Sequence, residues 1–207
     1  QEMREALPIL ARHKIPFLAH AELDSVSAPA NLMETPNSYK SYLASRPPIW
    51  EIEAIALLIS LCRRTSCPVH IVHLSASQAV HILQEAKEKY PITVETCPHY
   101  LYFSAEKVPD HTSFKCAPPI REEKNREALW KALQSGIIDF IASDHSPSPP
   151  EMKCLESGNF FKAWGGIASI QFGFSAMWRE ARERKISIDK VVHWMSSRPA
   201  EFLNLKE

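Results

Sequence analysis

The stretch Ile138-Asp139-Phe140-Ile141-Ala142-Ser143-Asp144-His145-Ser146-Pro147 decides the predicted fold. Its apolar run stops abruptly at a carboxylate and an imidazole. A short apolar run of this kind is typical of a buried strand in a parallel sheet. Barrel enzymes carry their chemistry at the carboxyl ends of such strands. We therefore expect Asp144 to lie in the active site of a metal-dependent hydrolase.

Three earlier apolar runs predict three more strands, and each of them also ends in polar residues. The runs are 15–19, 68–74 and 91–96, and the polar residues that follow or end them include His20, His73 and His99. Apolar residues at helical spacing predict helices between and after the strands. The predicted helices cover 2–14, 50–64, 79–89, 122–135, 168–184, 188–196 and 198–205. The polar segment 23–48 is too long for an ordinary connection, which favours an active-site loop.

A strand followed by a helix, four times over, predicts an α/β fold with a parallel sheet. The polar strand ends would mark a crevice in a doubly wound sheet, or the top rim of a (β/α)8 barrel. No glycine-rich phosphate loop follows any of the predicted strands, which disfavours a nucleotide-binding doubly wound sheet. Four units are half of a barrel.

Composition narrows the class of protein. The chain has 207 residues, with 24 Lys and Arg against 24 Asp and Glu, so that its formal charge is zero. We expect neither a nucleic-acid nor a membrane partner, because there is no basic excess and no apolar run of about 20 residues. The five cysteines contain no CxxC pair, which favours reduced thiols and a cytoplasmic protein. They are Cys62, Cys67, Cys97, Cys116 and Cys154.

The polar strand ends offer ligands for a metal ion. Imidazole nitrogens and carboxylate oxygens together suit zinc or a similar divalent cation. A water molecule on such a cation loses its proton near neutral pH, and a nearby carboxylate can carry that proton to a leaving nitrogen. A single histidine at a strand end is more often structural, so the metal hypothesis depends on His20, His73 and Asp144 agreeing. His70 and His81 are weaker candidates, because His70 lies within a strand and His81 on a helix.

Five motifs, in their order and rough spacing, resemble the cyclic amidohydrolases. This family includes dihydroorotase, dihydropyrimidinase (hydantoinase) and allantoinase. The motifs are His20-Ala21-Glu22, His73-Leu74-Ser75, Thr96-Cys97-Pro98-His99-Tyr100, Pro118-Pro119-Ile120-Arg121 and Ser143-Asp144-His145-Ser146-Pro147. Within the family, the allantoinases resemble the chain more closely. The stretches that favour them are 115–121, 143–153 and 162–168.

This resemblance implies a barrel hydrolase that opens the hydantoin ring of allantoin to give allantoate, a step of purine breakdown. It implies that His20 and His73, on strands five and six, are zinc ligands. It also implies that Asp144, on strand eight, is both a ligand and the general acid/base. The family's two divalent ions, expected to be Zn²⁺, are bridged by hydroxide and by a carboxylated lysine.

The same resemblance places other residues beside the substrate. His99 and the backbone around Ala117 are expected to contact it, and Ser146 is a weaker candidate for a contact. The segment Trp164-Gly165-Gly166 could let backbone approach the substrate ring, since glycine has no Cβ, or it could be a simple turn.

The chain also departs from the family pattern. It has no His-x-His pair for a first strand, no lysine at the place of the carboxylated one, and no small β-sandwich domain. We therefore expect residues 1–207, which open on Gln1 rather than Met, to be strands five to eight, the C-terminal half of a (β/α)8 TIM barrel. By itself, such a fragment is expected to be inactive and not to hold a two-metal centre. The full-length protein is expected to be a homo-oligomer.

Two other functions stay open. One is a neighbouring activity, that of a dihydropyrimidinase or a dihydroorotase. Dihydroorotase-like sites carry an Asn before the two prolines, where this chain has Ala117, which counts against the second. The other is a non-catalytic scaffold related to dihydropyrimidinase. Such proteins lose ligand positions, whereas His20, His73 and Asp144 are all present here.

Overall fold

A parallel sheet forms the centre of the chain in a computed structural model, which describes residues 2–27 and 34–205. Its four strands lie in sequence order, and each pairs in parallel with the next. They are β1 (Phe17–Ala19), β2 (Val69–Ile71), β3 (Ile92–Thr96) and β4 (Phe140–Ile141). Parallel neighbours in sequence order need crossover connections, which the intervening helices provide. The predicted α/β class with a parallel sheet is confirmed.

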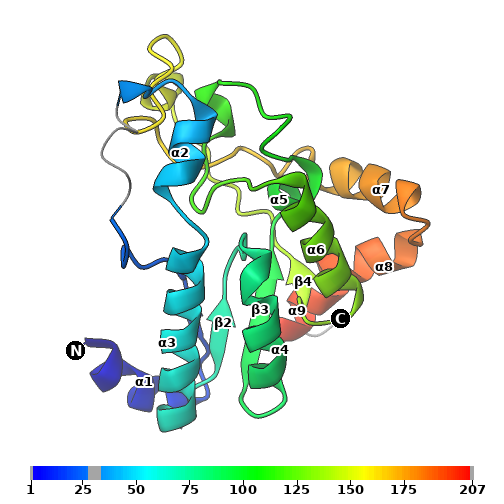
Figure 1. Cartoon of the computed structure of the whole chain (residues 1–207). Coiled ribbons are helices and arrows are strands. Elements are labelled where there is room, and N and C mark those ends of the chain that lie inside the picture. The colour runs from blue at the N-terminus through cyan, green and yellow to red at the C-terminus, as the bar shows by residue number, and fades with distance from the viewer. Residues whose placement is uncertain (1, 28–33, 206–207) are drawn as a thin grey trace.

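Helices connect the strands and cover the sheet (Figure 1). The α-helices are α1 (Glu2–His13), α2 (Tyr39–Ser45), α3 (Ile49–Thr65), α4 (Val80–Lys87), α5 (Pro98–Tyr102), α6 (Glu123–Gln134), α7 (Gly173–Glu183), α8 (Ile188–Val192) and α9 (Arg198–Phe202). Short 3₁₀ turns lie at Ser77–Ala79, Thr112–Phe114 and Pro150–Lys153, and a π-helical turn, His193–Ser197, joins α8 to α9. Among the described residues, no helix has the length and apolar character needed to cross a bilayer.

The two faces of the sheet have different coverings. Val69 and Ile71 of β2 are buried in the main hydrophobic core, and α3, α4 and α6 lie along this side of the sheet (Figure 1). His70 points to the opposite face, because side chains alternate along a strand. There its ring stacks on Phe140, with centroids 5.1 Å apart, and contacts Phe202 of α9. Its two nitrogens bond Thr93 and Glu95, so His70 is part of the interior rather than a strand-end ligand.

Two helices lie where the sequence predicted loops. Helix α2 lies within the polar segment 23–48, of which 28–33 fall outside the described residues. Its Tyr39 and Tyr42 are buried and pack on Phe160, with ring centroids 5.6 and 5.9 Å away. Helix α5 follows β3 directly. Both helices are too short to show a helical repeat in the sequence. Packing against residues distant in the chain stabilises them.

Some element boundaries also differ from the prediction. Strand β2 ends at Ile71 rather than 74, because His73 has a left-handed backbone with φ of 43°. Left-handed φ is incompatible with an extended strand. Helix α7 begins at Gly173 rather than 168. The residues before it run beside the loop that follows β4, where His145 and Ile167 form a parallel bridge.

A buried ion pair joins α3 to the loops above the sheet. Glu51 and Arg121 are both almost fully buried, and Arg121 Nη2 donates to Glu51 Oε1 over 2.7 Å. The other oxygen of Glu51 accepts hydrogen bonds from the backbone N–H groups of Ser75 and Ala76, each over 2.9 Å. Arg121 also donates to the carbonyl oxygen of Arg46. One pair therefore fixes three loop segments that lead into the candidate site.

We predict that Arg121→Met destabilises the fold strongly. The change leaves Glu51 as a buried carboxylate without its cation, which costs about 3–5 kcal/mol. The free energy of unfolding from urea titration measures the effect. Lys107→Met is the control, because Lys107 pairs with Glu123 on the surface, where an ion pair contributes less than about 1 kcal/mol. Equal losses in the two variants would contradict the role given to the buried pair.

Candidate functional site

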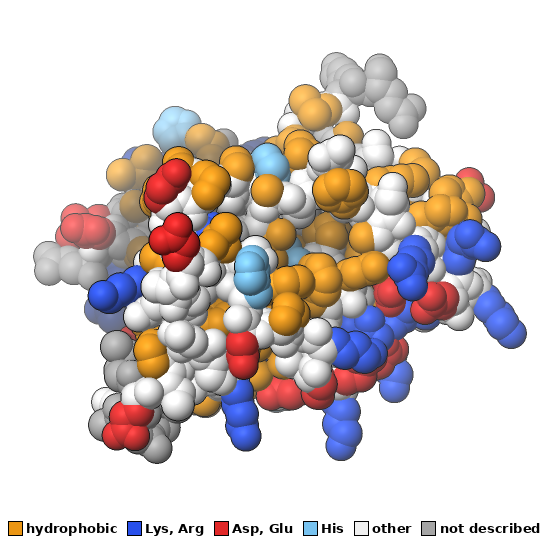
Figure 2. Space-filling model, turned by 90° about the horizontal axis from the view of Figure 1, so that it is seen from above, with side chains coloured by type: hydrophobic (Ala, Val, Ile, Leu, Met, Phe, Trp, Pro, Cys, Tyr) orange, Lys and Arg blue, Asp and Glu red, His pale blue; other side chains and the backbone are white. Residues whose placement is uncertain are grey.

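The predicted site residues lie where the parallel strands end. His20 follows β1, His73 lies two residues after β2, and Asp144 lies three residues after β4. His99 is in the first turn of α5, directly after β3. Figure 2 looks onto this face of the molecule and shows histidine side chains among hydrophobic ones. The structure thus brings four elements of the sequence pattern to one edge of the sheet.

His20 and His73 form a pair that is suited to one cation. Nδ1 of His20 and Nε2 of His73 are 2.9 Å apart. Two nitrogens on one tetrahedral zinc ion lie about 3.3 Å apart, as Zn–N bonds of 2.0–2.1 Å require. A small rotation of the rings would therefore let both nitrogens face the same ion. The two side chains differ in exposure, since His20 is 45% exposed and His73 is buried.

Glu22 orients His20. Its Oε2 accepts a hydrogen bond from Nε2 of His20 over 2.9 Å, which leaves Nδ1 as the free nitrogen that faces His73. Arg46 holds the same carboxylate through two hydrogen bonds. Burial by itself raises the pKa of Glu22, but the hydrogen bonds from His20 and Arg46 outweigh it and lower the pKa below its ordinary value. A carboxylate behind a metal-binding histidine is a common way to fix the tautomer of the ring.

The environment keeps His73 neutral. Burial, and then the neighbouring His20, lower the pKa of His73 to about 4. A metal ligand must present an unprotonated nitrogen, so this shift suits the predicted role. The left-handed φ of 43° at His73 is uncommon for a residue with a Cβ. Strained backbone of this kind gathers at functional sites.

Asp144 shares several of these properties. Its φ is 45°, again left-handed, and its side chain is half-buried. Burial, and then the charge of Glu95, raise the pKa of Asp144, while His20 acts in the opposite direction. A raised carboxyl pKa favours a group that must take up and release a proton near neutral pH. Its carboxylate lies within 4.8 Å of ligand atoms of Cys97 and His99.

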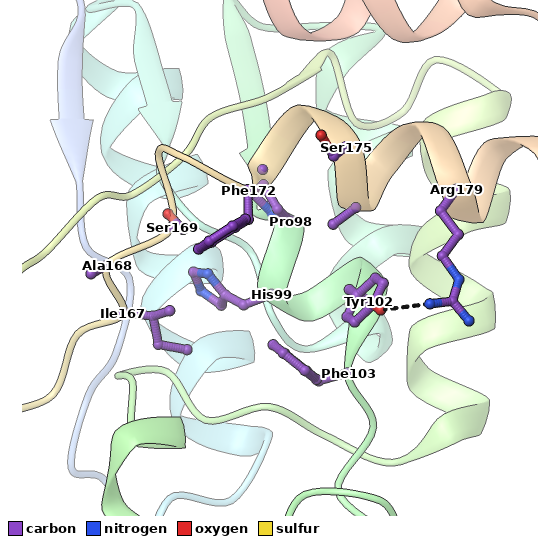
Figure 3. A pocket seen from close by; sticks show the side chains of 12 residues that line it. Pro98, His99, Tyr102, Phe103, Ile167, Ala168, Ser169, Phe172, Ser175 and Arg179 are labelled. Atoms are coloured by element: carbon purple, nitrogen blue, oxygen red, sulfur yellow. Dashed lines mark hydrogen bonds between the residues drawn. The ribbon is translucent and has the colours of Figure 1, made fainter.

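His99 is a buried imidazole that bonds nothing in the described part of the chain. Neither of its ring nitrogens has a hydrogen-bond partner there, and His99 is only 2% exposed, so that solvent does not replace the missing partner. Burial, and then His73, lower the pKa of His99 to about 3. The ring forms part of the wall of a cavity of about 490 Å³ between α5 and α7, with Phe103 and Phe172 opposite each other (Figure 3).

The segment 115–121 leaves one backbone carbonyl without a hydrogen bond from the described residues. At each remaining position of the segment, the carbonyl accepts a hydrogen bond from a hydroxyl group or a backbone N–H group. The donors are Gly166 N for Lys115, Tyr42 for Cys116, Tyr100 for Pro118, Ser75 for Pro119, Tyr39 for Ile120 and Ala105 N for Arg121. Within the described residues, Ala117 has no hydrogen bond at its N–H or its carbonyl. Ala117, the predicted substrate contact, is thus the residue of this segment whose carbonyl accepts no hydrogen bond from the described residues.

The two glycines of Trp164-Gly165-Gly166 pack beside the other predicted contacts. A Cβ on Gly165 would lie 3.6 Å from the Cβ of Ala117, which is an ordinary contact. A Cβ on Gly166 would lie 2.5 Å from the Cβ of Ser146 and 2.8 Å from its carbonyl oxygen. Ser146 also donates its backbone N–H to Ile167 over 3.1 Å. Gly166 is therefore required by packing between two loops of the site.

The whole chain, residues 1–207, matches the model of the Amidohydrolase family. The chain belongs to this family. It is 44% identical over 98% of its length to an allantoinase of Arabidopsis thaliana and 42% identical over 93% to an allantoinase of Saccharomyces cerevisiae. It covers 42% of each of these two relatives, so it spans less than half of their length.

Among solved structures, a D-hydantoinase (dihydropyrimidinase) from Thermus sp. is similar in fold. The TM-score is 0.88 with 25% identity, over 99% of this chain and 46% of that one. The family assignment agrees with the resemblance that the strand-end motifs gave.

The donor set of this amidohydrolase chain fits a divalent cation. His20 and His73 present facing nitrogens, Glu22 fixes one ring, and Asp144 adds a carboxylate nearby. A further histidine, His99, lies near Asp144. These residues could therefore hold one ion, with donors from elsewhere required for a second.

Two functional candidates were missed as individual residues by the sequence analysis. Glu22 stands two positions after His20, a spacing that lets a carboxylate reach back to the ring. Cys97 ends up beside Asp144 and His99, although its thiol was read only as reduced. Burial, and then Asp144, raise the pKa of Cys97 well above its ordinary value. The signal that could have found it is its place directly at the end of β3.

We predict that the metal-free chain loses stability as the pH falls from about 6.5 to about 4. The folded-state pKa values of His73 and His99 are about 4 and about 3, below the ordinary 6.5. In this window the unfolded chain binds protons that the folded chain does not, so unfolding becomes easier at lower pH. The slope is at most about 1.4 kcal/mol per pH unit for each histidine.

Urea titrations of chelator-treated protein at several pH values test this expectation. His99→Gln should reduce the dependence of the free energy of unfolding on pH by the contribution of one histidine. The double variant His73→Gln/His99→Gln should reduce it by the contributions of both. A profile in His99→Gln that runs parallel to that of the original chain would contradict the buried neutral state of His99.

We also predict opposite outcomes for alanine at the two neighbouring glycines. Gly166→Ala forces its Cβ into Ser146, side chain and backbone, and should destabilise the chain by about 1–3 kcal/mol. Gly165→Ala meets only ordinary contacts and should change stability by less than about 0.5 kcal/mol. Thermal unfolding followed by circular dichroism compares the two. Similar losses would mean that the loop moves to accept either side chain.

Proposed function

We propose that this chain is the part of an allantoinase that supplies strands five to eight of a (β/α)8 barrel. The observation that carries the proposal is the pairing of His20 with His73 beside Asp144, at the ends of parallel strands. The reaction is hydrolysis of a ring amide of allantoin to give allantoate, a step of purine breakdown. The relatives named allantoinase support this substrate.

His20, His73 and Asp144 would hold the cation. When bound, a divalent ion such as Zn²⁺ polarises a carbonyl oxygen and makes water more acidic. Asp144 is the general acid/base: its carboxylate takes the proton of the attacking water and delivers it to the ring nitrogen that leaves. The raised pKa of Asp144 supports this cycle, because a group that is too acidic returns a proton poorly.

The remaining residues bind and orient the substrate. The free N–H and carbonyl of Ala117 can donate to and accept from a cyclic amide, whose own N–H and C=O lie side by side. His99 and Ser146 are the proposed side-chain contacts. Glu22 acts through His20 as a positioning residue.

Other parts of the proposal concern the longer protein. Two divalent ions, bridged by a carboxylated lysine, would need the lysine and further ligands from outside this chain. A small β-sandwich domain and the N-terminal strands would likewise lie outside residues 1–207. Homo-oligomerisation and a cytoplasmic location also stay predictions.

A second candidate function is that of a dihydropyrimidinase or hydantoinase. The fold likeness to the Thermus sp. enzyme favours it. The three ligand positions in this chain count against a non-catalytic scaffold, and Ala117 counts against a dihydroorotase. Assays of the longer protein on allantoin, hydantoin, dihydrouracil and dihydroorotate would separate these activities, and a preference for any of the last three would reject the allantoinase proposal.

We predict that Asp144→Asn lowers turnover of allantoin by about 10³-fold or more in the longer protein, with folding intact, because the amide cannot carry the proton. Asp139→Asn is the matched control at the other end of the same strand. Asp139 pairs with Lys87 and Arg198, so its change should reduce stability and leave kcat nearly unchanged. Full activity of Asp144→Asn would remove Asp144 from the mechanism.

A further inference from the structure

A second group of possible ligands lies beside the histidine pair. Cys97 directly follows β3, His99 lies in the first turn of α5, and Asp144 comes from the loop after β4. The sulfur, a ring nitrogen and a carboxylate oxygen all lie within 4.8 Å of one another. His20 and His73 do not belong to this group. The three residues thus offer one soft, one borderline and one hard donor at a single point.

His99 points to a ligand in this place. Its ring is 2% exposed, and both nitrogens are without a partner among the described residues. An unpaired polar group of this kind costs about 1–3 kcal/mol, so such groups need an explanation. Neither nitrogen of His99 takes part in the contact between Nδ1 of His20 and Nε2 of His73. A bound cation would satisfy one of the two nitrogens directly.

The distances fit a tetrahedral ion after a small closure. Zinc–nitrogen and zinc–sulfur bonds place donor atoms about 3.3–3.8 Å apart, and the ligand atoms of this group lie within 4.8 Å of one another. Cys97 and His99 are fixed in the core, whereas Asp144 is half-buried on a loop and can make that movement. The cavity between α5 and α7, which His99 lines, offers room for a fourth ligand such as water (Figure 3).

The charge around the group also favours a cation. Asp144 is negative when ionised, and the carboxylate of Glu95 acts on both Asp144 and Cys97. Cys97 adds a second negative ligand when it binds, and its thiol proton leaves to solvent. A thiolate beside an imidazole selects zinc or softer ions over magnesium and calcium, which prefer oxygen.

We propose that Cys97, His99 and Asp144 form a separate binding site for a thiophilic divalent cation such as Zn²⁺ or Cd²⁺. The site shares Asp144 with the proposed catalytic centre. Cation binding there holds the carboxylate at Cys97 and withdraws it from proton transfer. Such a site makes the enzyme sensitive to excess zinc and to cadmium, because the carboxylate of Asp144 cannot serve Cys97 and the catalytic centre at the same time.

Cadmium binding to the chelator-treated 207-residue chain tests the proposal. The double variant His20→Asn/His73→Asn removes the histidine pair and leaves the new group. We expect this variant to bind Cd²⁺ in equilibrium dialysis and to show the ultraviolet absorption band of a cadmium–thiolate bond. Adding Cys97→Ser should remove the band and weaken binding by about 100-fold, because sulfur is the preferred donor for cadmium.

Two further variants keep the test informative if Cys97→Ser does not fold. Asp144→Asn and His99→Gln, each in the double variant, should weaken Cd²⁺ binding by about tenfold and keep the thiolate band. Cys62→Ser, which removes an equally buried thiol elsewhere, and Cys154→Ser, which removes the only thiol among the described residues that is not buried, are the controls and should change neither quantity.

Loss of the band in Cys154→Ser, or unchanged binding in both Asp144→Asn and His99→Gln, would overturn the proposal. The readout does not depend on turnover. The site can therefore fail while the allantoinase proposal stands, and Asp144 can fail as acid/base while the site stands.

Discussion

One buried carboxylate sets the shape of the loops above the sheet. Glu51 lies on α3, yet its two oxygens accept hydrogen bonds from Ser75 and Ala76 after β2 and from Arg121 at the end of the proline-rich segment. Hydrogen bonds to a charged group in a region without water are stronger than those between neutral groups. The loop that carries His73 and the segment that carries Ala117 are thereby fixed to the same helix. Their relative position does not depend on either loop's own sequence propensity.

The same segment explains how recognition can come from backbone rather than side chains. Tyrosine and serine hydroxyls bond the carbonyls around Ala117, so the segment cannot shift to pair that residue internally. A backbone carbonyl without a partner in the protein, such as that of the partly buried Ala117, is available to a ligand. Gly165 and Gly166 complete the arrangement, because any Cβ at Gly166 would push the loop away from Ser146.

The sequence predicted the sheet well because its strands are short apolar runs that end in polar residues, as buried parallel strands do. It predicted the gathering of His20, His73, His99 and Asp144 at one edge for the same reason. It did not predict α2 and α5, since each is held by contacts with residues more than 20 positions away, such as Tyr39 with Ile120. The roles of Glu22 and Cys97 follow from their closeness to His20 and to Asp144 in the folded chain. Neither hydrophobic periodicity nor a short motif predicts which loops come close together. The numbering of β1 to β4 as strands five to eight of a barrel depends on strands that lie outside this four-stranded sheet.

Left-handed backbone at His73 and Asp144 links these observations. Each residue has this backbone just after a strand. His73 contacts His20, which follows β1, and the carboxylate of Asp144 lies within 4.8 Å of ligand atoms of Cys97 and His99, which follow β3. Such backbone costs of the order of 1–3 kcal/mol per residue and persists only where the surroundings determine it. Near His73, the backbone N–H groups of Ser75 and Ala76 donate hydrogen bonds to Glu51 and hold the chain in place. At Asp144 the surroundings include the hydroxyl of Ser169, which donates to the carbonyl of Ser143. The donor atoms of the site are therefore placed by rigid backbone, and the half-buried carboxylate of Asp144 is the one member left with freedom to serve either the histidine pair or Cys97.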